Sequence, residues 1–505
     1  MSTKKNIKEI MSKRYIQIGI LIVLISLVCL MGTYAWFTWA SPSNTNVTLS
    51  IGNLADVTFT SGPDINISNL APVYNYTDGV STTFVMKNNS TTNNLNYGIK
   101  LDVTSISNEL KSESFKYTLL KDNKVVQTGN FKNAVNGKTL TLNAGLLAKG
   151  STSNYKLYFW IDGNIENSSS MMNKSLVGKI DVGEKTTYIN NLYNNSTKTP
   201  VVNNSITYQY DTTNNLMQDT AGNIRYYGAS PNNYIYFNCD SYPSTNCELW
   251  RIIGVFDGKI KLMRNSTIGS YSWDTSASSV NSGYGVNEWS QADLMKLLNP
   301  GHESESVGGS LYYNSRSGTC YNETNNATTS CNFTSTGIKN NTTRNMITET
   351  TWNLGGWDTS DIYSNEMYEK ERGTTTVSNP SDGITRATTW TGKIALPYPS
   401  DYGYATDLSK CSQTLYNYNS STDSYACRSN DWMYSIFKTN GFNWLLTPYS
   451  GNAHVAFYLR SEGYVNRSSR VYYARGVAPV LYLSSDQDIV SGEGSQSNPY
   501  RLTGN

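Results

Sequence analysis

The chain has 505 residues, enough for two or three domains that each bury a core. Charged residues make up only 15%, and the basic residues of segment 1–31 account for more than the whole formal net charge of +2. The remaining chain offers no broad basic surface, so nucleic acid is excluded as an expected partner. Two histidines leave little for metal binding or acid–base catalysis, and we expect no cofactor.

The N-terminus carries a basic stretch, "KKNIKEIMSKR", followed by an uncharged run from Tyr15 to Phe37. Such a run is either the core of a signal peptide or one membrane span. The basic flank is expected to stay in the cytoplasm, so everything after Trp36 faces outward. We therefore predict that residues 1–37 are a signal peptide or membrane anchor. The protein would be held at the cell membrane facing outward, or secreted after cleavage near Ala35.

Seven cysteines are present, and one of them, Cys29, lies inside the uncharged N-terminal run. The other six form three closely spaced pairs, which in an exported chain is typical of local disulfides. Zinc binding would need CxxC spacing, which is missing, and free thiols are disfavoured outside the cell. Spacing alone does not prove the pairing. We predict bonds joining Cys239 to Cys247, Cys320 to Cys331 and Cys411 to Cys427.

The segment 44–183 is predicted to form short strands separated by turns. Strands of this composition, with no strong helix between them, predict an all-β sandwich over residues 38–184. In "YKLYFWI" the alternate residues Tyr155, Leu157, Phe159 and Ile161 can share one face. The expected strands are "NVTLSIG", "DVTFT", "STTFVMKN", "NYGIKLDV", "FKYTLLKD", "KVVQTGNF", "TLTLNA", "NYKLYFWIDG" and "LVGKIDVGE".

The stretch "GTYAWFT" (Gly32–Thr38) closes the N-terminal run just before the predicted sandwich. In this arrangement residues 1–184 resemble the camelysin and TasA group of secreted bacterial proteins. The resemblance implies processing by a dedicated signal peptidase and, for some members, assembly into biofilm fibres. Thr38 and Trp39 stand where that group often carries an acidic residue. Camelysin is classed as a metalloprotease, but no HExxH motif occurs here, so protease activity is not carried over.

Residues 185–205 lack a clear apolar period and are predicted to be a linker. The remainder, 206–505, is predicted to be an α+β domain, because strands are followed by helices and long loops and then by further strands. "LWRIIGVFDGKIKLM" is expected to form a hairpin that turns at Asp257-Gly258.

Three short helices are expected in the C-terminal half. The first lies in "WSQADLMKLLNP", with Ser290 as its N-cap. The others are expected over 338–348 and 431–438. The inward face of the first helix would be formed by Leu294, Leu297 and Leu298.

Five motifs of this half resemble, in the same order, a family of bacterial extracellular domains of unknown function. They are "LWRIIGVFDGKIKLM", "NEWSQADLMKLLN", "KIALPYPSDYGYA", "WLLTPYS" and "GVAPVLYL". The resemblance covers most of Tyr234–Leu502 and implies a C-type-lectin-like fold, of the kind shared with the formylglycine-generating enzyme. One departure is Ala478, where Arg is usual before the proline.

The sequence lacks the residues that proteins of such folds use for oxidase catalysis or for calcium-dependent sugar binding. Formylglycine-generating catalysis needs two reduced, metal-binding cysteines, whereas Cys411 and Cys427 are expected to be disulfide-bonded. The Glu-Pro-Asn, Gln-Pro-Asp and Trp-Asn-Asp triplets of calcium-dependent lectins do not occur. Asn430-Asp431-Trp432 has another order, and Asp431 is better explained as a helix N-cap. A calcium site of scattered oxygens stays open. We predict a non-enzyme.

The stretch "WLLTPYSGNAHVAFYLRSEGY" (Trp444–Tyr464) changes from an apolar run to a period of two, the mark of a strand with one buried face. Alternate residues from Gly451 to Leu459 are expected to face the core. The other side mixes an imidazole, phenols, guanidiniums and amides, which binding surfaces favour. A solvated edge strand in a chain rich in Tyr, Asn and Ser explains this side equally well. The predicted ligand-binding residues are Asn452, His454, Tyr458, Arg460, Tyr464, Asn466, Arg470 and Tyr472.

Together these predictions describe a bacterial cell-surface or secreted protein that displays a C-type-lectin-like binding or adhesion domain on a β-sandwich stalk. Its partners would be an extracellular glycan or protein ligand, and the membrane through residues 15–37. One alternative is a structural subunit of an extracellular fibre or biofilm matrix, which self-assembles when a strand near Asn44–Ile51 joins a neighbour's sheet. Another is a variable protein of a diversity-generating retroelement, because such proteins use this fold and carry mutable positions in a similar C-terminal stretch.

Overall fold

The computed structural model describes residues 47–502, with gaps at 52–59, 69, 89–94, 133, 166–167, 185–186, 277–284, 324–328, 379, 381, 420–423, 440 and 485–486. The predicted signal or membrane segment 1–37, Cys29 and Ala35 lie outside these residues. Across the described ranges, no helix combines the length and the apolar character that crossing a membrane requires.

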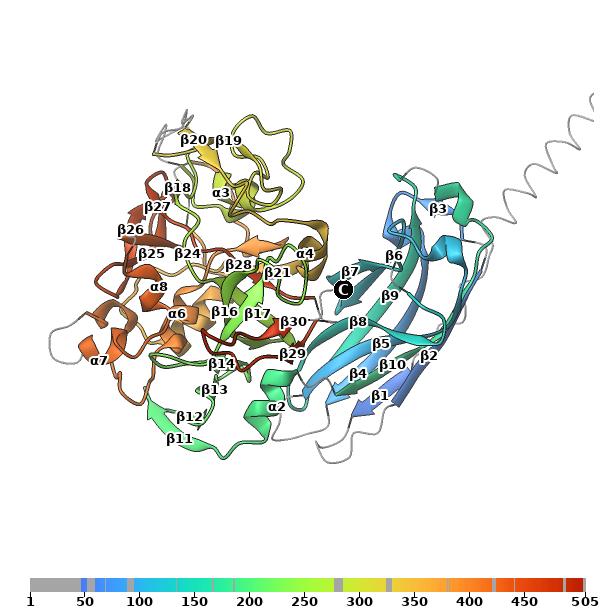
Figure 1. Ribbon diagram of the computed structural model, residues 1–505, viewed down its shortest axis with the longest axis horizontal. Coiled ribbons are helices and arrows are strands. Elements are labelled where there is room, and N and C mark those ends of the chain that lie inside the picture. Colours follow the sequence, from blue (N-terminus) through green and yellow to red (C-terminus); the bar gives the residue numbers. More distant parts are fainter. Residues whose placement is uncertain are drawn as a thin grey trace, which may run out of the picture.

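Two sheets form a sandwich at the N-terminal side of the described chain (Figure 1). The first sheet has the order β1 (Val47–Ile51), β4 (Val80–Asn88), β9 (Thr152–Asp162), β6 (Phe115–Lys121) and β7 (Lys124–Asn130), with β3 (Pro72–Val73) beside β9. The second has the order β2 (Thr60–Ile67), β10 (Leu176–Glu184), β5 (Leu95–Ile106) and β8 (Lys138–Leu147). Short 3-10 turns lie at Tyr76–Asp78, Asn108–Leu110 and Ser168–Met171.

The sandwich core confirms the predicted periodicity of β9. Tyr155, Leu157, Phe159 and Ile161 are all buried in one cluster between the sheets. The phenol oxygens of Tyr97 and Tyr155 lie 2.5 Å apart inside this core, so each buried hydroxyl has a partner.

Strand β2 was not predicted, because Gly62 and Pro63 read as strand breakers. The structure places β2 at an edge of its sheet, where a proline is tolerated. Its register against β10 shifts between Asp64 and Ser61, so Gly62 and Pro63 fall at a bulge.

The predicted linker is wrong, because most of 185–205 belongs to the second domain. Helix α2 (Tyr188–Asn194) begins after Thr187, whose side chain caps the Asn190 N–H. Ile189 and Tyr193 of this helix are buried in the core of the second domain. Strand β11 (Thr199–Asn203) then pairs with β12 (Ile206–Asp211). The second domain therefore begins near Thr187.

The second domain is an α+β unit with two main sheets (Figure 1). The larger sheet has the order β11, β12, β13 (Leu216–Gln218), β14 (Ile224–Tyr226), β16 (Glu248–Phe256), β17 (Lys259–Arg264), β28 (Val480–Tyr482) and β23 (Ile394–Ala395), with β15 (Tyr234–Phe237) also on β16. The smaller has the order β18 (Ser270–Ser272), β27 (Ala474–Gly476), β24 (Phe442–Pro448), β25 (Val455–Arg460) and β26 (Val465–Arg470).

Short elements fill the connections between these sheets. Three strand pairs are β19 (Ser317–Cys320) with β20 (Thr329–Asn332), β21 (Thr350–Asn353) with β22 (Thr389–Gly392), and β29 (Ile489–Ser491) with β30 (Arg501–Leu502). The helices are α3 (Asp293–Leu298), α4 (Asn341–Met346), α5 (Ser364–Glu371), α6 (Pro399–Ala405), α7 (Ser424–Arg428) and α8 (Tyr434–Phe437), with 3-10 turns at Trp289–Gln291 and Leu415–Asn417.

The predicted hairpin is confirmed as β16 and β17. Asp257 and Gly258 both have positive φ, as a tight two-residue turn requires. Helix α3 buries its three leucines as expected, but Ser290 is not its N-cap. Instead, the Ser290 N–H and hydroxyl both donate to the carboxylate of Glu288, which caps the preceding 3-10 turn.

All three predicted disulfides are present: Cys239 to Cys247, Cys320 to Cys331 and Cys411 to Cys427. Each closes a loop of the second domain. Disulfides persist in oxidising environments, so they favour an extracellular or secreted protein.

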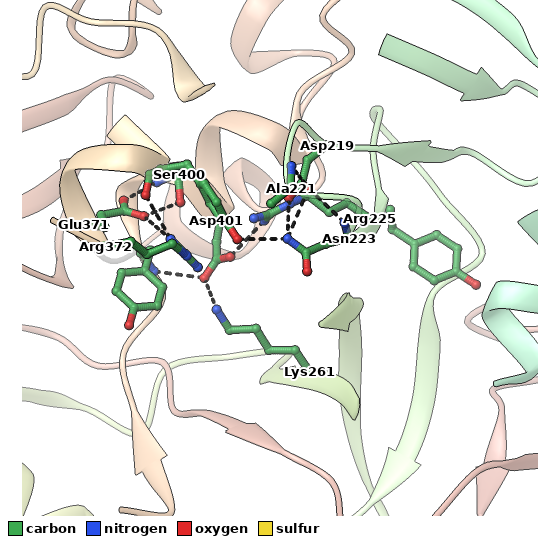
Figure 2. Close-up of polar contacts among 12 residues, drawn as sticks. Asp219, Ala221, Asn223, Arg225, Lys261, Glu371, Arg372, Ser400 and Asp401 are labelled. Atoms are coloured by element: carbon green, nitrogen blue, oxygen red, sulfur yellow. Dashed lines mark hydrogen bonds and ion pairs between the residues drawn. The ribbon is translucent and has the colours of Figure 1, made fainter. Parts of the chain in front are cut away.

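A buried ion-pair network fixes α6 to the larger sheet (Figure 2). Asp401 accepts from Arg225 Nη1 at 3.0 Å and from Lys261 Nζ at 2.5 Å. Asp219 accepts from Arg225 Nε at 2.6 Å, so two acids balance two cations. Burial alone would raise the pKa of Asp401, but the charges of Lys261 and Arg225 outweigh it and hold this pKa below its usual value.

Beside this network, Glu371 of α5 accepts hydrogen bonds from the backbone N–H and the hydroxyl of Ser400 (Figure 2). Its carboxylate also contacts Arg372 at 3.2 Å. Glu371 and Ser400 are buried, and the Arg372 side chain is only 23% exposed, so these groups chiefly position helices.

Candidate ligand-binding surface

The turn before β25 is held by two buried polar side chains. The Asn287 amide donates to the carbonyls of Tyr449, Asn452 and Val455 at distances of 2.8–3.1 Å. Arg386 donates to the Asn287 side-chain oxygen and to the Ala453 carbonyl, at 3.0 and 2.8 Å. The backbone from Tyr449 to Val455 is thereby folded into a turn.

This turn corrects the alternation expected from the sequence. Strand β25 begins only at Val455, so Gly451 and Asn452 lie in the turn and are exposed. His454, predicted to point outward, is only 5% exposed, and its Nδ1 lies 2.6 Å from the Gly285 carbonyl. His454 is therefore part of the packing beneath the surface.

Within β25 successive side chains point to opposite faces of the sheet, as predicted, but Tyr458 on the face predicted to be exposed is buried. Phe442 pairs with Arg460, and Tyr458 pairs with Asn466, so these side chains lie on the same face of the smaller sheet. Tyr458 is only 7% exposed because the Phe442 ring packs edge-on against it, with centroids 5.6 Å apart.

Seven side chains form a continuous series of ring and guanidinium contacts on this side of the domain, which we call the aromatic–arginine row. Starting from the 3-10 turn, Tyr416 contacts Tyr464 with ring centroids 5.6 Å apart. The Arg460 guanidinium lies 5.3 Å from the Tyr464 ring and 5.1 Å from the Phe442 ring. These four residues form the first half of the row.

The second half of the row continues from the other side of Phe442. The Arg475 guanidinium lies 4.8 Å from the Phe442 ring and 4.9 Å from the Tyr473 ring. Tyr473 and Tyr472 follow, with ring centroids 4.4 Å apart. The full row is Tyr416, Tyr464, Arg460, Phe442, Arg475, Tyr473 and Tyr472.

Long-range pairing brings these residues together. Tyr416 lies in the loop that the Cys411–Cys427 disulfide closes, and Arg475 lies on β27, whose Gly476 pairs with Asn443 of β24. Most side chains of the row are partly accessible, but Tyr464, which was predicted to point outward, is only 9% exposed. Tyr416 is 44% exposed, the Arg460 side chain is 30% exposed, and Phe442, Arg475, Tyr472 and Tyr473 are half-buried.

The two arginines of the row differ in their charge environment. Arg460 lies 3.4 Å from the exposed carboxylate of Glu462. Arg475 has no carboxylate within 4 Å among the residues that the structure describes, and it donates only to the Ser469 hydroxyl and the Ala474 carbonyl. Burial lowers the pKa of Arg475, as expected for a cation partly withdrawn from water.

The predicted site residues thus divide into three groups. Arg460, Tyr464 and Tyr472 lie in the row. Tyr458 and Asn466 lie beside it on the same face, and exposed Arg470 ends β26 and interacts electrostatically with Tyr472. Asn452 and His454 lie apart in the Asn287-held turn. Whether any of them binds a ligand stays a prediction.

Sequence reasoning missed Tyr416, Phe442, Arg475 and Tyr473. Tyr473 and Arg475 directly follow the last predicted residue, Tyr472, and Tyr473 falls out of step with the period of two, because a turn at Val471–Tyr473 interrupts the strands. No sequence signal places Tyr416 here beyond the cysteine pair around it.

Apart from the row, a hollow with a volume of about 480 Å³ lies beside α2. Its lining includes Tyr188, Asn191, Asn195 and Thr213, and no ionisable group other than Tyr188. No group of three or more residues suited to hold a metal ion occurs within the described part of the chain.

Comparison with known proteins gives little. No family model and no curated protein matches the chain. One similar solved structure is a family 35 carbohydrate-binding module from an environmental isolate, with 15% identity over 29% of this chain and 88% of that chain and a TM-score of 0.16. Another is the C-terminal domain of EclA, a sugar-binding protein, with 17% identity over 29% and 91% of the two chains and a TM-score of 0.16. At such TM-scores these likenesses carry no argument about fold or function.

Proposed function

We propose that the protein is a bacterial cell-surface or secreted binding protein, in which the β-sandwich presents a second domain of the C-type-lectin-like kind. Its N-terminal segment anchors or exports it, and it acts by recognition, without catalysis. The disulfides support the export step. The disulfide between Cys411 and Cys427 also removes the two thiols that an oxidase of the related fold would need.

The aromatic–arginine row is the observation that carries this proposal. Tyr and Arg are enriched among the residues that dominate the energetics of protein recognition. Tyr offers a large contact area with a small loss of conformational freedom, and the planar guanidinium of Arg can donate several hydrogen bonds at once. Here they adjoin one another on a paired sheet, and the Asn287-held turn fixes the start of β25. A preorganised surface loses little entropy on binding.

A binding screen of the full-length chain, disulfides intact, on glycan and bacterial-surface arrays tests the proposal. The test variant combines Arg460→Gln with Tyr473→Ala, because both side chains are accessible. His454 is unsuitable, since its buried ring supports the fold. The control is Tyr74→Ala, which alters a side chain that is 80% exposed on the sandwich.

Binding by the parent and control but not by the double variant supports recognition through the row. Equal binding by all three places the site elsewhere on the protein. No binding by a folded parent to any array contradicts the proposal.

A second candidate function is a subunit of an extracellular fibre, and one observation favours it. Strand β1 lies at the edge of its sheet and pairs with β4 in parallel, whereas β4 and β9 pair antiparallel. A short edge strand close to the N-terminal segment is suited to exchange with a neighbouring copy. Deleting residues 36–52 should then abolish heat-stable high-mass species. Single chains in both forms would contradict fibre assembly.

A further inference from the structure

Arg475 combines three properties that one side chain rarely has at a surface. It is half-buried, it stacks between two aromatic rings, and it has no carboxylate partner within 4 Å in the described ranges. The exposed carboxylate of Glu323 acts on Arg475 only from beyond ion-pair distance. Withdrawing a guanidinium from water without a directly paired carboxylate costs free energy that an anionic ligand would recover. The stacking holds its planar fork in one orientation.

From this geometry we infer that the aromatic–arginine row binds a polysaccharide that carries carboxylate groups, with the carboxylate at Arg475 and sugar rings on the neighbouring aromatic side chains. The inference deepens the proposed function and rests on it. A guanidinium fork matches a carboxylate through two parallel hydrogen bonds. Nε and Nη1 of Arg475 bind Ser469 and Ala474, and Nη2 has no hydrogen-bond partner among the described residues.

The rings on either side supply the second half of the recognition. Phe442 and Tyr473 flank Arg475, and exposed Tyr416 ends the row beyond Tyr464. Aromatic rings offer apolar faces to the C–H side of a sugar, and the phenol hydroxyls can bond its hydroxyl groups. An extended row also suits a chain of sugars better than a single monosaccharide.

The surrounding charges favour spaced carboxylates over a densely charged polymer. Glu462 lies beside Arg460, and exposed Glu323 accepts from the Ala474 N–H at 3.3 Å. These two carboxylates flank the row and would repel a polyphosphate more than a polyuronate, because the charges of a polyphosphate lie closer together along the chain. One carboxylate per sugar fits a single unpaired guanidinium between neutral rings.

Equilibrium binding of the full-length chain to polygalacturonate and alginate tests this inference. The comparison probes are fully methyl-esterified polygalacturonate, which keeps the sugars and loses the charge, and polyphosphate. The variants are Arg475→Gln and Arg475→Lys. The control is Arg316→Gln, an exposed arginine outside the row.

We expect binding to at least one polyuronate, no comparable binding to the methyl ester, and weak binding to polyphosphate. Arg475→Gln should weaken binding by roughly tenfold or more, Arg475→Lys by less, and Arg316→Gln by less than about twofold. Circular dichroism confirms that each variant is folded.

Four outcomes would overturn the inference. Equal binding to acid and methyl ester would show recognition of neutral sugar, and the proposed function would stand. Stronger binding to polyphosphate would show recognition of charge density alone. Binding to no polyuronate, or polyuronate binding that is unchanged in Arg475→Gln, would show that the row does not bind an anionic polysaccharide through Arg475. The proposed function is tested separately by the array screen.

Discussion

The guanidinium of Arg475 lies 4.8 Å from the ring of Phe442, at the centre of the aromatic–arginine row. Arg460 lies 5.1 Å from the same ring, so one aromatic side chain separates two like charges. Each cation–π contact of this kind is worth about 0.5–1 kcal/mol. Phe442 therefore holds both guanidiniums in place, although it carries no polar group of its own.

Replacing Phe442 by leucine should loosen both arginines while keeping an apolar side chain at the start of β24. We expect polyuronate binding to weaken by roughly three- to tenfold with a small change in melting temperature, measured by biolayer interferometry and differential scanning fluorimetry. Tyr74→Leu on the sandwich is the control and should change neither. Unaltered binding in a folded Phe442→Leu protein would show that the row does not act as a unit.

The Cys411–Cys427 bond should matter for binding as well as stability, because its loop carries Tyr416. Replacing both cysteines by serine should lower the free energy of unfolding by about 3 kcal/mol, as expected for a loop of this length. Polyuronate binding by this double variant should weaken as its stability falls. The matched control replaces Cys239 and Cys247, which close a loop elsewhere. If both double variants bind like the parent, Tyr416 has no part in recognition.

Asp401→Asn should destabilise the second domain strongly. It removes the charge that Arg225 and Lys261 share, and leaves two buried cations undercompensated. We expect a loss of about 3–5 kcal/mol in urea unfolding. Glu113→Gln, which removes an exposed ion pair with Lys132, should change stability by less than about 1 kcal/mol. Similar small effects for both would mean that the buried network is not maintained in solution.

Asn287→Ala should release the turn before β25. Three backbone carbonyls would lose the Asn287 amide as a donor, although the Val455 carbonyl keeps the Tyr449 N–H. We expect a total cost of about 2–3 kcal/mol. Amide exchange across Tyr449–Val455 should accelerate before that of β16. Amide exchange that accelerates equally in Tyr449–Val455 and in β16 of the variant would contradict a local role for Asn287.

The buried carboxyl group of Asp431 should make the stability of the folded protein depend on pH. Burial raises the pKa of Asp431 to about 8, despite hydrogen bonds from Thr406, Met433 and Tyr434. Between its ordinary pKa of 3.8 and about 8, the folded state keeps a proton that the unfolded state releases. Stability is therefore greatest at low pH in this window and falls as pH rises, by about 1.4 kcal/mol per pH unit from this group.

Asp431→Asn should reduce the slope of stability against pH between pH 5 and 8, because the amide cannot lose a proton in either state. Part of the slope should remain, because burial also raises the pKa of Glu371, to about 7. The measurement is urea unfolding at intervals across that range. Asp358→Asn, an exposed substitution, serves as the control and should keep the parental slope. A parental slope in Asp431→Asn would show that Asp431 is ionised in the folded protein.

Strand β9 was predictable from the sequence, because its period of two is local. In β9 every predicted inward residue is buried. Edge strand β2 was missed because Gly62 and Pro63 are accommodated by a bulge that only its pairing with β10 creates. Helix α2 was missed because two buried side chains, Ile189 and Tyr193, stabilise it through contacts distant in sequence.

The candidate site was only partly predictable. Of the residues predicted in and after the stretch that follows Trp444, three lie in the aromatic–arginine row: Arg460, Tyr464 and Tyr472. The strand limits were not predictable, because Asn287 and Arg386 set the start of β25 from far along the chain. Phe442 and Tyr416 reach the row through sheet pairing and a disulfide loop, which no local pattern encodes.

Hydrogen–deuterium exchange of the full-length chain with and without polygalacturonate tests the central claim most directly. The account predicts protection in Phe442–Asn443, in 458–476 and in Leu415–Asn417, with little change in the sandwich or around α2. Protection confined to the sandwich or to the hollow beside α2, or none at saturating polysaccharide, would contradict the assignment of the aromatic–arginine row as the recognition surface.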